Sequence, residues 1–323
     1  RRPWLPRPHV HTHQRRDTGR VNLSGIASPG ARSLPRPVAR EIYHSQSNSQ
    51  PELAVTTLKS CLLTLSATIV LALPPLSIAE DLEVRVLAQK PISRTLFTQG
   101  LEFDDNDLLI SSGLYKVSKL LRLNFTSMET TRKRELSPKL FAEGLTVLND
   151  RVYQLTWRSE LILIYDKESF KELDRWSISG QGWGLTNNGK ELIYSNGSNR
   201  LTCVEPSNGK TVRSLDVFMN GGSVRRLNEL EWIDGEIWAN IWGSNYIAII
   251  NPQTGIVTRR VNLTGLLPPS DRRRDTDVLN GIARHPETGA IWVTGTRWPS
   301  LYQKELESTL QAADNPDPHT APD

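Results

Sequence analysis

The stretch EGLTVLNDRVYQLTW, residues 143–157, contains two β-rich runs on either side of an Asn-Asp pair. Runs of this kind around turn-forming residues predict a β-hairpin. The same pattern recurs in four other places, with the position of its glycine occupied by Gly100, Gly184, Glu229 and Gly281. These positions are 40 to 52 residues apart, which is the period of a four-stranded propeller blade.

The repeats predict an all-β fold, a five-bladed β-propeller over residues 80–306. Third strands and further turns follow the hairpin in the middle repeats, and no segment shows sustained helical periodicity. The fifth repeat runs into a Pro-rich tail before its outer strand, so we expect Leu82–Leu87 to supply that strand and close the ring without free edges. The alternative, a β-sandwich of about ten strands, leaves five equivalent motifs unexplained.

The repeat also predicts where chemistry takes place. The residue before each glycine position enters the innermost strand at one end of a central channel, and the second strand of the hairpin returns to that end. Ten positions therefore meet at one mouth: Gln99, Glu143, Trp183, Asn228, Asn280, Gly113, Trp157, Gly197, Trp242 and Thr296. Glu102 follows two residues after Gly100 and is expected to face the same channel. Aromatic walls with few polar groups predict a small-molecule site, although each Trp could instead pack between sheets.

Composition excludes several other classes of protein. The net charge is +4, but residues 1–59 hold nine Arg and one Lys against three carboxylates, so the rest of the chain is close to −3 and shows no basic surplus for nucleic acid. The cysteines are Cys61 and Cys203, and five of the six histidines lie in polar tails. No zinc quartet, disulfide framework or His-based triad can be assembled from these residues, so we expect no metal and no cofactor.

A secretory signal is expected at residues 60–79. Lys59 precedes the apolar run 60–73, and Ser77 and Ala79 stand at the −3 and −1 positions of a cleavage site after Ala79. The run is short for a membrane span, although an uncleaved anchor is the alternative. We interpret residues 1–59 as a disordered or artefactual extension, with translation starting near Val55, and residues 307–323 as a disordered tail. The expected product is a secreted or periplasmic monomer without stable membrane association.

Six ordered motifs of this sequence closely resemble those of the plant- and bacterial-type glutaminyl cyclases, over residues 92 to 303. They are Phe97-Thr98-Gln99-Gly100-Leu101, Phe141-Ala142-Glu143-Gly144-Leu145-Thr146, Tyr153-Gln154-Leu155-Thr156-Trp157, Gly182-Trp183-Gly184-Leu185-Thr186, Asn228-Glu229-Leu230-Glu231-Trp232 with Trp238-Ala239-Asn240-Ile241-Trp242, and Leu279-Asn280-Gly281-Ile282-Ala283. The resemblance implies a five-bladed propeller that converts N-terminal glutamine of peptides or proteins to pyroglutamate and releases ammonia, an aminoacyltransferase reaction.

The resemblance also implies roles for the mouth residues. Glu143 is the expected general base and acid, with Glu102 as a second carboxylate near the amine. Asn228 is expected to hold the carboxamide or the oxyanion. The remaining predicted substrate-binding residues enclose the glutamine side chain or shape the floor and mouth of the pocket: Phe97, Gln99, Trp157, Trp183, Trp242, Asn280 and Thr296.

Two positions depart from the family pattern. The family lysine of a Thr-Gly-Lys-x-Trp-Pro motif is replaced by Thr296, with Arg297 as the next residue, and Gln181 stands where Glu is usual. Adjacent strand residues point to opposite faces, so Arg297 is not an automatic replacement for the lysine. Two other functions remain open at this point. One is a propeller that binds amines or peptide N-termini without turnover, and the other is a metal-dependent lactonase-type propeller.

Overall fold

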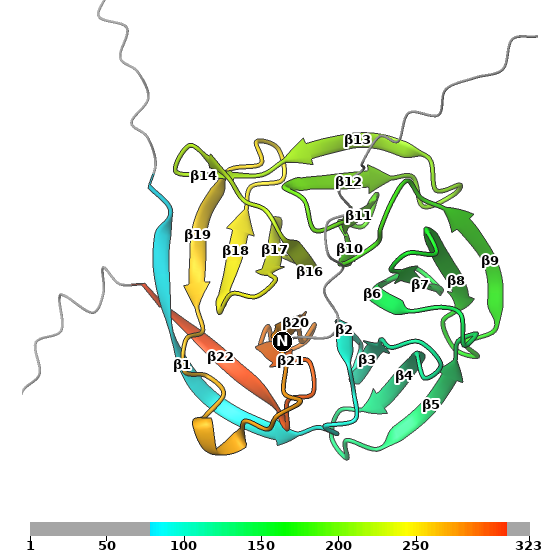
Figure 1. The fold of residues 1–323 in the computed structure, drawn as a ribbon, viewed down its shortest axis with the longest axis horizontal. Coiled ribbons are helices and arrows are strands. Elements are labelled where there is room, and N and C mark those ends of the chain that lie inside the picture. Colours follow the sequence, from blue (N-terminus) through cyan, green and yellow to red (C-terminus); the bar gives the residue numbers. More distant parts are fainter. Residues whose placement is uncertain (1–77, 309–323) are drawn as a thin grey trace, which may run out of the picture. The chain divides into compact units, whose positions relative to one another are not determined.

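The structure of the protein, a computed structural model, describes residues 78–308. Residues 1–77 and 309–323 lie outside this description, and with them most of the expected extension, signal and tail. Apart from one short 3-10 helix, η1 (Pro269–Asp271), the regular structure of the described residues is β-strand. The sheets stand around a common centre, like the blades of a propeller (Figure 1). Within residues 78–308 no helix is long and apolar enough to cross a membrane.

Three of the sheets are four-stranded antiparallel meanders in which each strand pairs with the next strand along the chain. The first contains β2 (Thr98–Asp104), β3 (Asp107–Ser112), β4 (Lys119–Asn124) and β5 (Thr130–Glu135). The second contains β6 (Ala142–Leu148), β7 (Arg151–Thr156), β8 (Leu161–Asp166) and β9 (Glu172–Ser177). The third contains β10 (Leu185–Asn187), β11 (Leu192–Ser195), β12 (Arg200–Val204) and β13 (Thr211–Asp216).

The remaining strands form one eight-stranded sheet and one small hairpin. The order in the large sheet is β16-β17-β18-β19-β1-β22-β21-β20. Its strands are β16 (Leu227–Ile233), β17 (Glu236–Ile241), β18 (Tyr246–Ile250), β19 (Val257–Asn262), β1 (Glu80–Pro91), β20 (Leu279–Arg284), β21 (Ile291–Gly295) and β22 (Ser300–Ser308). The hairpin β14 (Phe218–Met219) and β15 (Gly222–Ser223) lies in the connection between β13 and β16.

The N-terminal strand joins two parts of the large sheet. β1 pairs antiparallel with β22 over most of its length, from Leu82 to Pro91. Its first residues, Glu80 to Leu82, pair in parallel with β19. The strand therefore begins earlier and ends later than the expected segment Leu82–Leu87, and it hydrogen-bonds on both edges.

The innermost strands contact one another in a ring, in the order β2, β6, β10, β16, β20 and back to β2. This close approach explains the repeated glycine. A Cβ on Gly184 would lie 1.9 Å from the carbonyl oxygen of Asn228 in the next sheet. Apolar side chains fill the space between neighbouring sheets, as in the cluster of Leu155, Ile164 and Tyr194. A rigid ring of inner strands thus fixes the side chains that face its centre.

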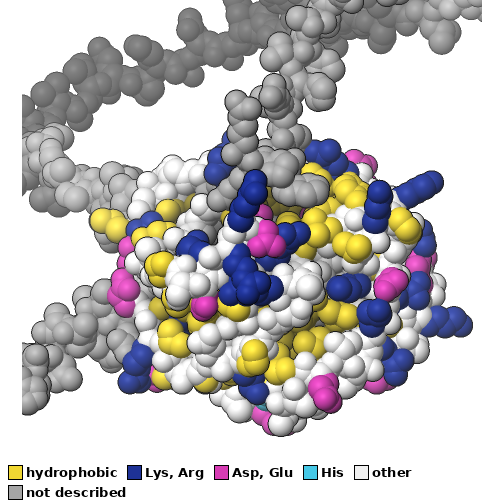
Figure 2. Space-filling model, turned by 60° about the horizontal axis from the view of Figure 1, so that its bottom comes forward, with side chains coloured by type: hydrophobic (Ala, Val, Ile, Leu, Met, Phe, Trp, Pro, Cys, Tyr) yellow, Lys and Arg dark blue, Asp and Glu magenta, His cyan; other side chains and the backbone are white. Residues whose placement is uncertain are grey.

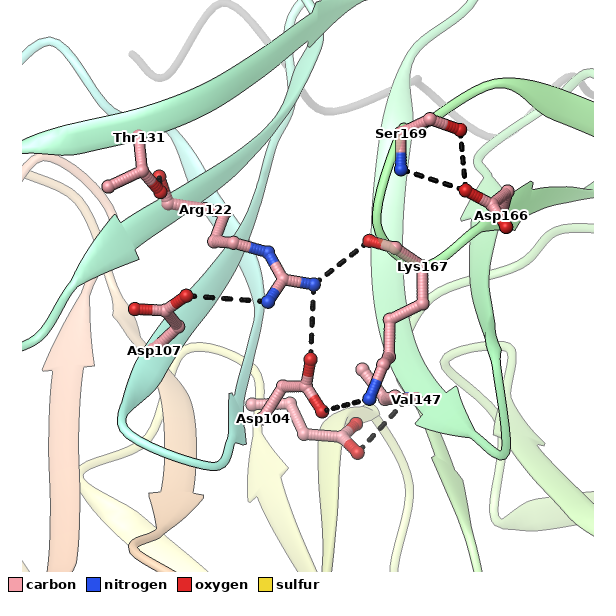
Figure 3. Close-up of polar contacts among 9 residues, drawn as sticks. Asp104, Asp107, Arg122, Thr131, Val147, Asp166, Lys167 and Ser169 are labelled. Atoms are coloured by element: carbon pink, nitrogen blue, oxygen red, sulfur yellow. Dashed lines mark hydrogen bonds and ion pairs between the residues drawn. The ribbon is translucent and has the colours of Figure 1, made fainter.

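An ion-pair network ties the first two sheets together at the end of the inner strands opposite the predicted mouth (Figure 3). The Arg122 guanidinium lies 3.0 Å from Asp104 and 3.3 Å from Asp107, and Arg122 Nη2 donates to the carbonyl oxygen of Lys167 over 2.9 Å. Lys167 Nζ reaches the other oxygen of Asp104 at 3.0 Å. Four charged residues therefore neutralise one another at this end of the molecule.

Candidate active site

The predicted mouth residues lie where the inner strands begin. The buried ones are polar: the exposed fraction is 4% for Glu143, 4% for Asn228, 0% for Asn280 and 1% for Thr296. The aromatic residues Phe97, Trp157, Trp183 and Trp242 are each only partly buried. The site therefore has a buried polar floor beneath aromatic walls that remain open to solvent.

Side-chain amides connect the floor into one hydrogen-bonded chain. Asn228 Nδ2 donates to Asn280 Oδ1 over 2.9 Å, and Asn280 Nδ2 donates to Gln99 Oε1 over 2.7 Å. The Gln99 side chain in turn hydrogen-bonds the Glu143 carboxyl. Asn280 accepts through its oxygen and donates through its nitrogen, so its amide orientation is fixed between Asn228 and Gln99. The chain therefore links Asn228 to Glu143 through two intervening amides.

Burial raises the pKa of Glu143 well above its usual range, and the hydrogen bond with Gln99 opposes that rise only in part. A raised pKa favours the protonated carboxyl, which can donate its proton and take one up again. This is the property that a general acid–base catalyst needs.

The aromatic walls form two series of edge contacts. Phe97 lies edge-on to Phe141, with ring centroids 6.0 Å apart, and Phe141 to Trp157 at 5.4 Å. On the other side, the Trp183 and Trp242 rings are 6.5 Å apart. Phe141 is the link that the sequence analysis left out of the site, although it stands two residues before Glu143 in the same motif.

The predicted exit glycines make room for these rings. Gly197 has a φ of +78°, and a Cβ there would lie 2.7 Å from the Trp183 indole. A side chain at this position would therefore both strain the backbone and displace an aromatic wall.

Gln181 joins the two sides of the wall. Its Oε1 accepts a hydrogen bond from Trp157 Nε1 over 2.8 Å and from Trp183 Nε1 over 3.1 Å. In the sequence, this position stands out only because Gln181 occurs where the family usually has Glu. In the structure, the Gln181 side chain orients two of the three tryptophans of the site.

Glu102 belongs to a second group of carboxyls further along the inner strands. Its Oε1 accepts from the Val147 backbone N–H over 3.0 Å. Burial raises its pKa to about 8 against the opposing hydrogen bonds of Thr146 and Val147, with a further rise from nearby Asp104. Burial raises the pKa of Glu231 and of Glu229, and the nearby Glu102 charge raises both further. The structure thus groups Glu102 with these two residues, and its predicted catalytic role stays a prediction.

Glu229 occupies the glycine position of the fourth repeat and acts as a bridge between inner strands. Burial raises its pKa. Its two oxygens accept from the backbone N–H groups of Leu101, at 3.3 Å, and of Ile282, at 3.0 Å. The carboxyl group therefore ties β16 to β2 and β20 below the amide chain. The sequence indicated this bridging role only by placing Glu229 where the other four repeats have glycine.

The Thr296–Arg297 step differs from the strand geometry assumed from sequence. β21 ends at Gly295, and Arg297 adopts a φ of 61° in the turn that follows. Thr296 Oγ1 donates to the carbonyl oxygen of Thr98 over 3.0 Å. The Arg297 guanidinium lies 5.7 Å from the centre of the Phe97 ring and donates to Asp275 over 2.9 Å. Alternation applies only within a strand, so it does not decide the direction of Arg297, and whether Arg297 replaces the lysine stays open.

The arrangement suits a small substrate with an amide or an amine. The amide chain offers donors and acceptors beside one buried carboxyl, and the aromatic walls offer apolar surface for a short aliphatic stem. No group of three His, Cys, Asp or Glu side chains within residues 78–308 is placed to hold a metal ion.

Comparison with known proteins gives consistent matches. The family model for glutamine cyclotransferases matches residues 54–306. A glutaminyl-peptide cyclotransferase of Arabidopsis thaliana is 35% identical over 239 residues, which cover 72% of this chain and 74% of the relative. The crystal structure of the Myxococcus xanthus glutaminyl cyclase is similar with a TM-score of 0.67 and 32% identity, over 72% of this chain and 99% of that one.

Proposed function

Because this chain belongs to the glutamine cyclotransferase family, we propose that it converts the N-terminal glutamine of peptides or proteins to pyroglutamate. In this reaction the α-amine nitrogen attacks the γ-carboxamide carbon of the same residue. A C–N bond forms, the bond to the carboxamide nitrogen breaks, and ammonia leaves. The acyl group of the glutamine side chain is thereby transferred to its own amine, which makes the enzyme an aminoacyltransferase.

The observation that carries the proposal is the buried Glu143 carboxyl at the end of the chain of amides. The attacking amine must lose a proton, and the leaving nitrogen must gain one. A single carboxyl between the two nitrogens accepts the first proton and donates it to the second, so no net proton is consumed by the enzyme. The raised pKa of Glu143 fits this exchange because burial favours the protonated carboxyl, which is the form that donates to the leaving nitrogen.

The other residues position the substrate. The Asn228 side chain, oriented by Asn280, would donate to the carboxamide oxygen as it becomes an oxyanion. Trp157, Trp183 and Trp242 would fold the glutamine stem so that its amine and carboxamide meet. Glu102 retains its predicted role as a second carboxylate, although its hydrogen bond to Val147 places it beyond the amide chain.

We also propose the finer architecture expected from the repeats. Five inner strands in a ring support a count of five blades, in which the eight-stranded sheet contributes the fourth and the fifth. Pairing of β1 with β22 supports closure of the fifth blade by the N-terminal strand.

Export remains part of the proposal. β1 begins at Glu80, directly after the expected cleavage site. Ala79 packs in the core and donates its N–H to Asn220 over 2.9 Å, so cleavage would remove that contact. N-terminal sequencing of the exported protein tests this point, since a mature chain that retained residues 60–73 would indicate an anchor.

The test of the activity uses the full chain with a Gln-initiated dipeptide amide and measures released ammonia. We expect turnover by the wild type and a fall in kcat of about 10² to 10⁴ in Glu143→Gln, the range for positioned acid–base groups. Glu160→Gln changes an exposed carboxylate near the same mouth and is the matched control. Binding without ammonia release, or full turnover by Glu143→Gln, would contradict the proposal.

A further inference from the structure

Three arginines lie against the aromatic walls of the site. The guanidinium of Arg158 is 4.1 Å from the Trp157 ring centre. That of Arg226 is 5.8 Å from Trp242, and that of Arg297 is 5.7 Å from Phe97. They lie in three different connections, between β7 and β8, between β15 and β16, and between β21 and β22, so positive charge borders the pocket on several sides.

Two of these arginines keep their charge available. Arg158 and Arg226 are exposed, and neither has a carboxylate of residues 78–308 within ion-pair distance, whereas Arg297 is paired with Asp275. Stacking on a ring holds a guanidinium in place while its N–H groups remain free to donate. Arg158 and Arg226 can therefore donate hydrogen bonds to an anionic group that approaches from solvent.

The rest of the mouth end is also basic. Two kinds of loop lie at this end: those that lead from the outer strand of one four-stranded unit to the inner strand of the next, and those that join the second and third strands of a unit. They carry ten cationic residues, namely Arg94, Lys116, Lys139, Arg158, Arg225, Arg226, Arg272, Arg273, Arg274 and Arg297. They carry four acidic residues, namely Glu160, Asp271, Asp275 and Asp277. We call these ten cationic residues the basic rim.

The connections at the opposite end have the reverse balance. They hold eight acidic residues, Asp105, Glu129, Asp150, Glu168, Glu191, Glu205, Asp234 and Glu287, against the four lysines Lys167, Lys171, Lys190 and Lys210. The lower edge of the Figure 1 view, with β1 and β22, comes forward in Figure 2, which shows several Lys and Arg side chains with Asp and Glu scattered among them. The charge of the described residues is thus segregated between the two ends of the molecule.

We infer that the basic rim recognises acidic side chains in the positions that follow the N-terminal glutamine of the substrate. The inference rests on the proposed cyclase activity and names its substrate class. A peptide advances about 3.3–3.6 Å per residue when extended, and the arginines stack on the walls that would hold the glutamine. The second to fourth residues of a bound peptide therefore pass the rim.

The rim has a second effect on the same substrate. Nearby cations disfavour another positive charge, so the rim favours the uncharged α-amine, which is the nucleophile. Acidic residues in the peptide compensate the repulsion that a free α-ammonium would meet on approach, and the field of the rim accelerates encounter with them. Binding and activation of the substrate are thereby served by the same charges.

The test compares kcat/KM for three C-terminally amidated peptides of matched shape: Gln-Asp-Glu-Gly, Gln-Asn-Gln-Gly and Gln-Lys-Lys-Gly. We expect the acidic peptide to exceed the neutral one by about tenfold at low salt, and the ratio to shrink at high salt, because exposed charges are screened. Arg158→Gln and Arg226→Gln should each lower the acidic-to-neutral ratio by roughly two- to fivefold, the scale of one exposed ion pair. Arg132→Gln, an exposed residue of the outer strand β5, should leave the ratio unchanged.

The remaining outcomes decide against the inference or against the activity. Equal kcat/KM for the three peptides, or the same loss on acidic and neutral peptides in the arginine variants, would overturn the inference and leave the cyclase activity standing. Absence of ammonia from every peptide would contradict the activity, and calorimetric binding of the three peptides would then test the rim alone. Tight, arginine-dependent binding to phosphatidylglycerol vesicles or to a single-stranded oligonucleotide, without preference among the peptides, would assign the rim to a general anionic surface.

Discussion

Trp157 and Trp183 donate their indole N–H groups to one oxygen, Oε1 of Gln181, over 2.8 and 3.1 Å. The two rings come from different sheets, so a single side chain sets the distance between two walls of the pocket. The wall geometry therefore depends on a residue that need not touch the substrate itself.

Gln181→Ala should loosen both walls and raise KM by roughly 5- to 30-fold, since each lost hydrogen bond is worth about 1 kcal/mol. The effect on kcat should be smaller, because the proton transfer at Glu143 does not involve Gln181. Steady-state kinetics with a Gln-initiated peptide measure both constants. Gln181→Glu keeps an acceptor oxygen for both indoles and should restore KM, while an equal defect in the two variants would contradict a positioning role.

Thr296→Lys restores the family residue at the mouth and should raise kcat by up to about tenfold, because it places a cation where the oxyanion forms. Thr296→Met is the control, since it has similar length without charge and loses the same hydrogen bond to Thr98. Equal rates for the two variants, together with a damaging Arg297→Ala, would assign the required charge to Arg297.

The stability of the protein should fall as pH rises from about 4.5 to 8. The pKa of Glu102 is raised to about 8 by burial, so over this range the unfolded chain loses a proton that the folded protein retains. Glu102→Gln keeps an acceptor for Val147 and should make this decline shallower, by at most about 1.4 kcal/mol per pH unit. Urea unfolding at pH 5 and pH 8 measures it. Glu129→Gln, an exposed control, should follow the wild type, and a parallel course for Glu102→Gln would contradict the assignment.

Lys304→Met should stabilise the protein by about 1–3 kcal/mol at pH 7, the cost of a buried polar group without a partner. Lys304 is 5% exposed, and its Nζ has no hydrogen-bond partner among the described residues. Burial lowers its pKa to about 8, so the wild type should regain stability as pH rises from 8 towards 10.5, and the variant should not. Thermal melts at pH 7 and pH 10 test this, with the exposed Lys171→Met as control. Loss of stability in Lys304→Met would contradict this prediction, because it would show that the Lys304 ammonium makes a favourable interaction in the folded protein.

The sequence predicted the all-β, propeller-like fold and the place of the polar floor from one repeated position. Gly184 shows why this prediction succeeded. The inner strands approach so closely there that a Cβ would collide with Asn228, so the repeated glycine marks the positions at which neighbouring sheets touch. The residues beside it, Glu143, Asn228 and Asn280, are then placed by the backbone alone, and Gln99 joins them in one hydrogen-bonded chain.

Other features depend on tertiary geometry that a repeat does not encode. The direction of Arg297 follows from a left-handed turn after β21, and the grouping of Glu102 with Glu229 and Glu231 depends on which strands face one another across the ring. The basic rim was hidden because the charges at the two ends nearly cancel when counted along the chain. The cationic and acidic residues separate only when each connection is assigned to the end of the molecule at which it lies.

The pairing of β1 with β22 has a consequence for the order in which the chain folds. Arg85 and Glu305 lie in paired strands but are 220 residues apart in the sequence. Contacts this distant form late, because the loss of chain entropy precedes any gain from the contact. The first strand must therefore remain unpaired on this edge until the last strand has been synthesised. During that interval β1 presents an open edge that is exposed to pairing with other chains.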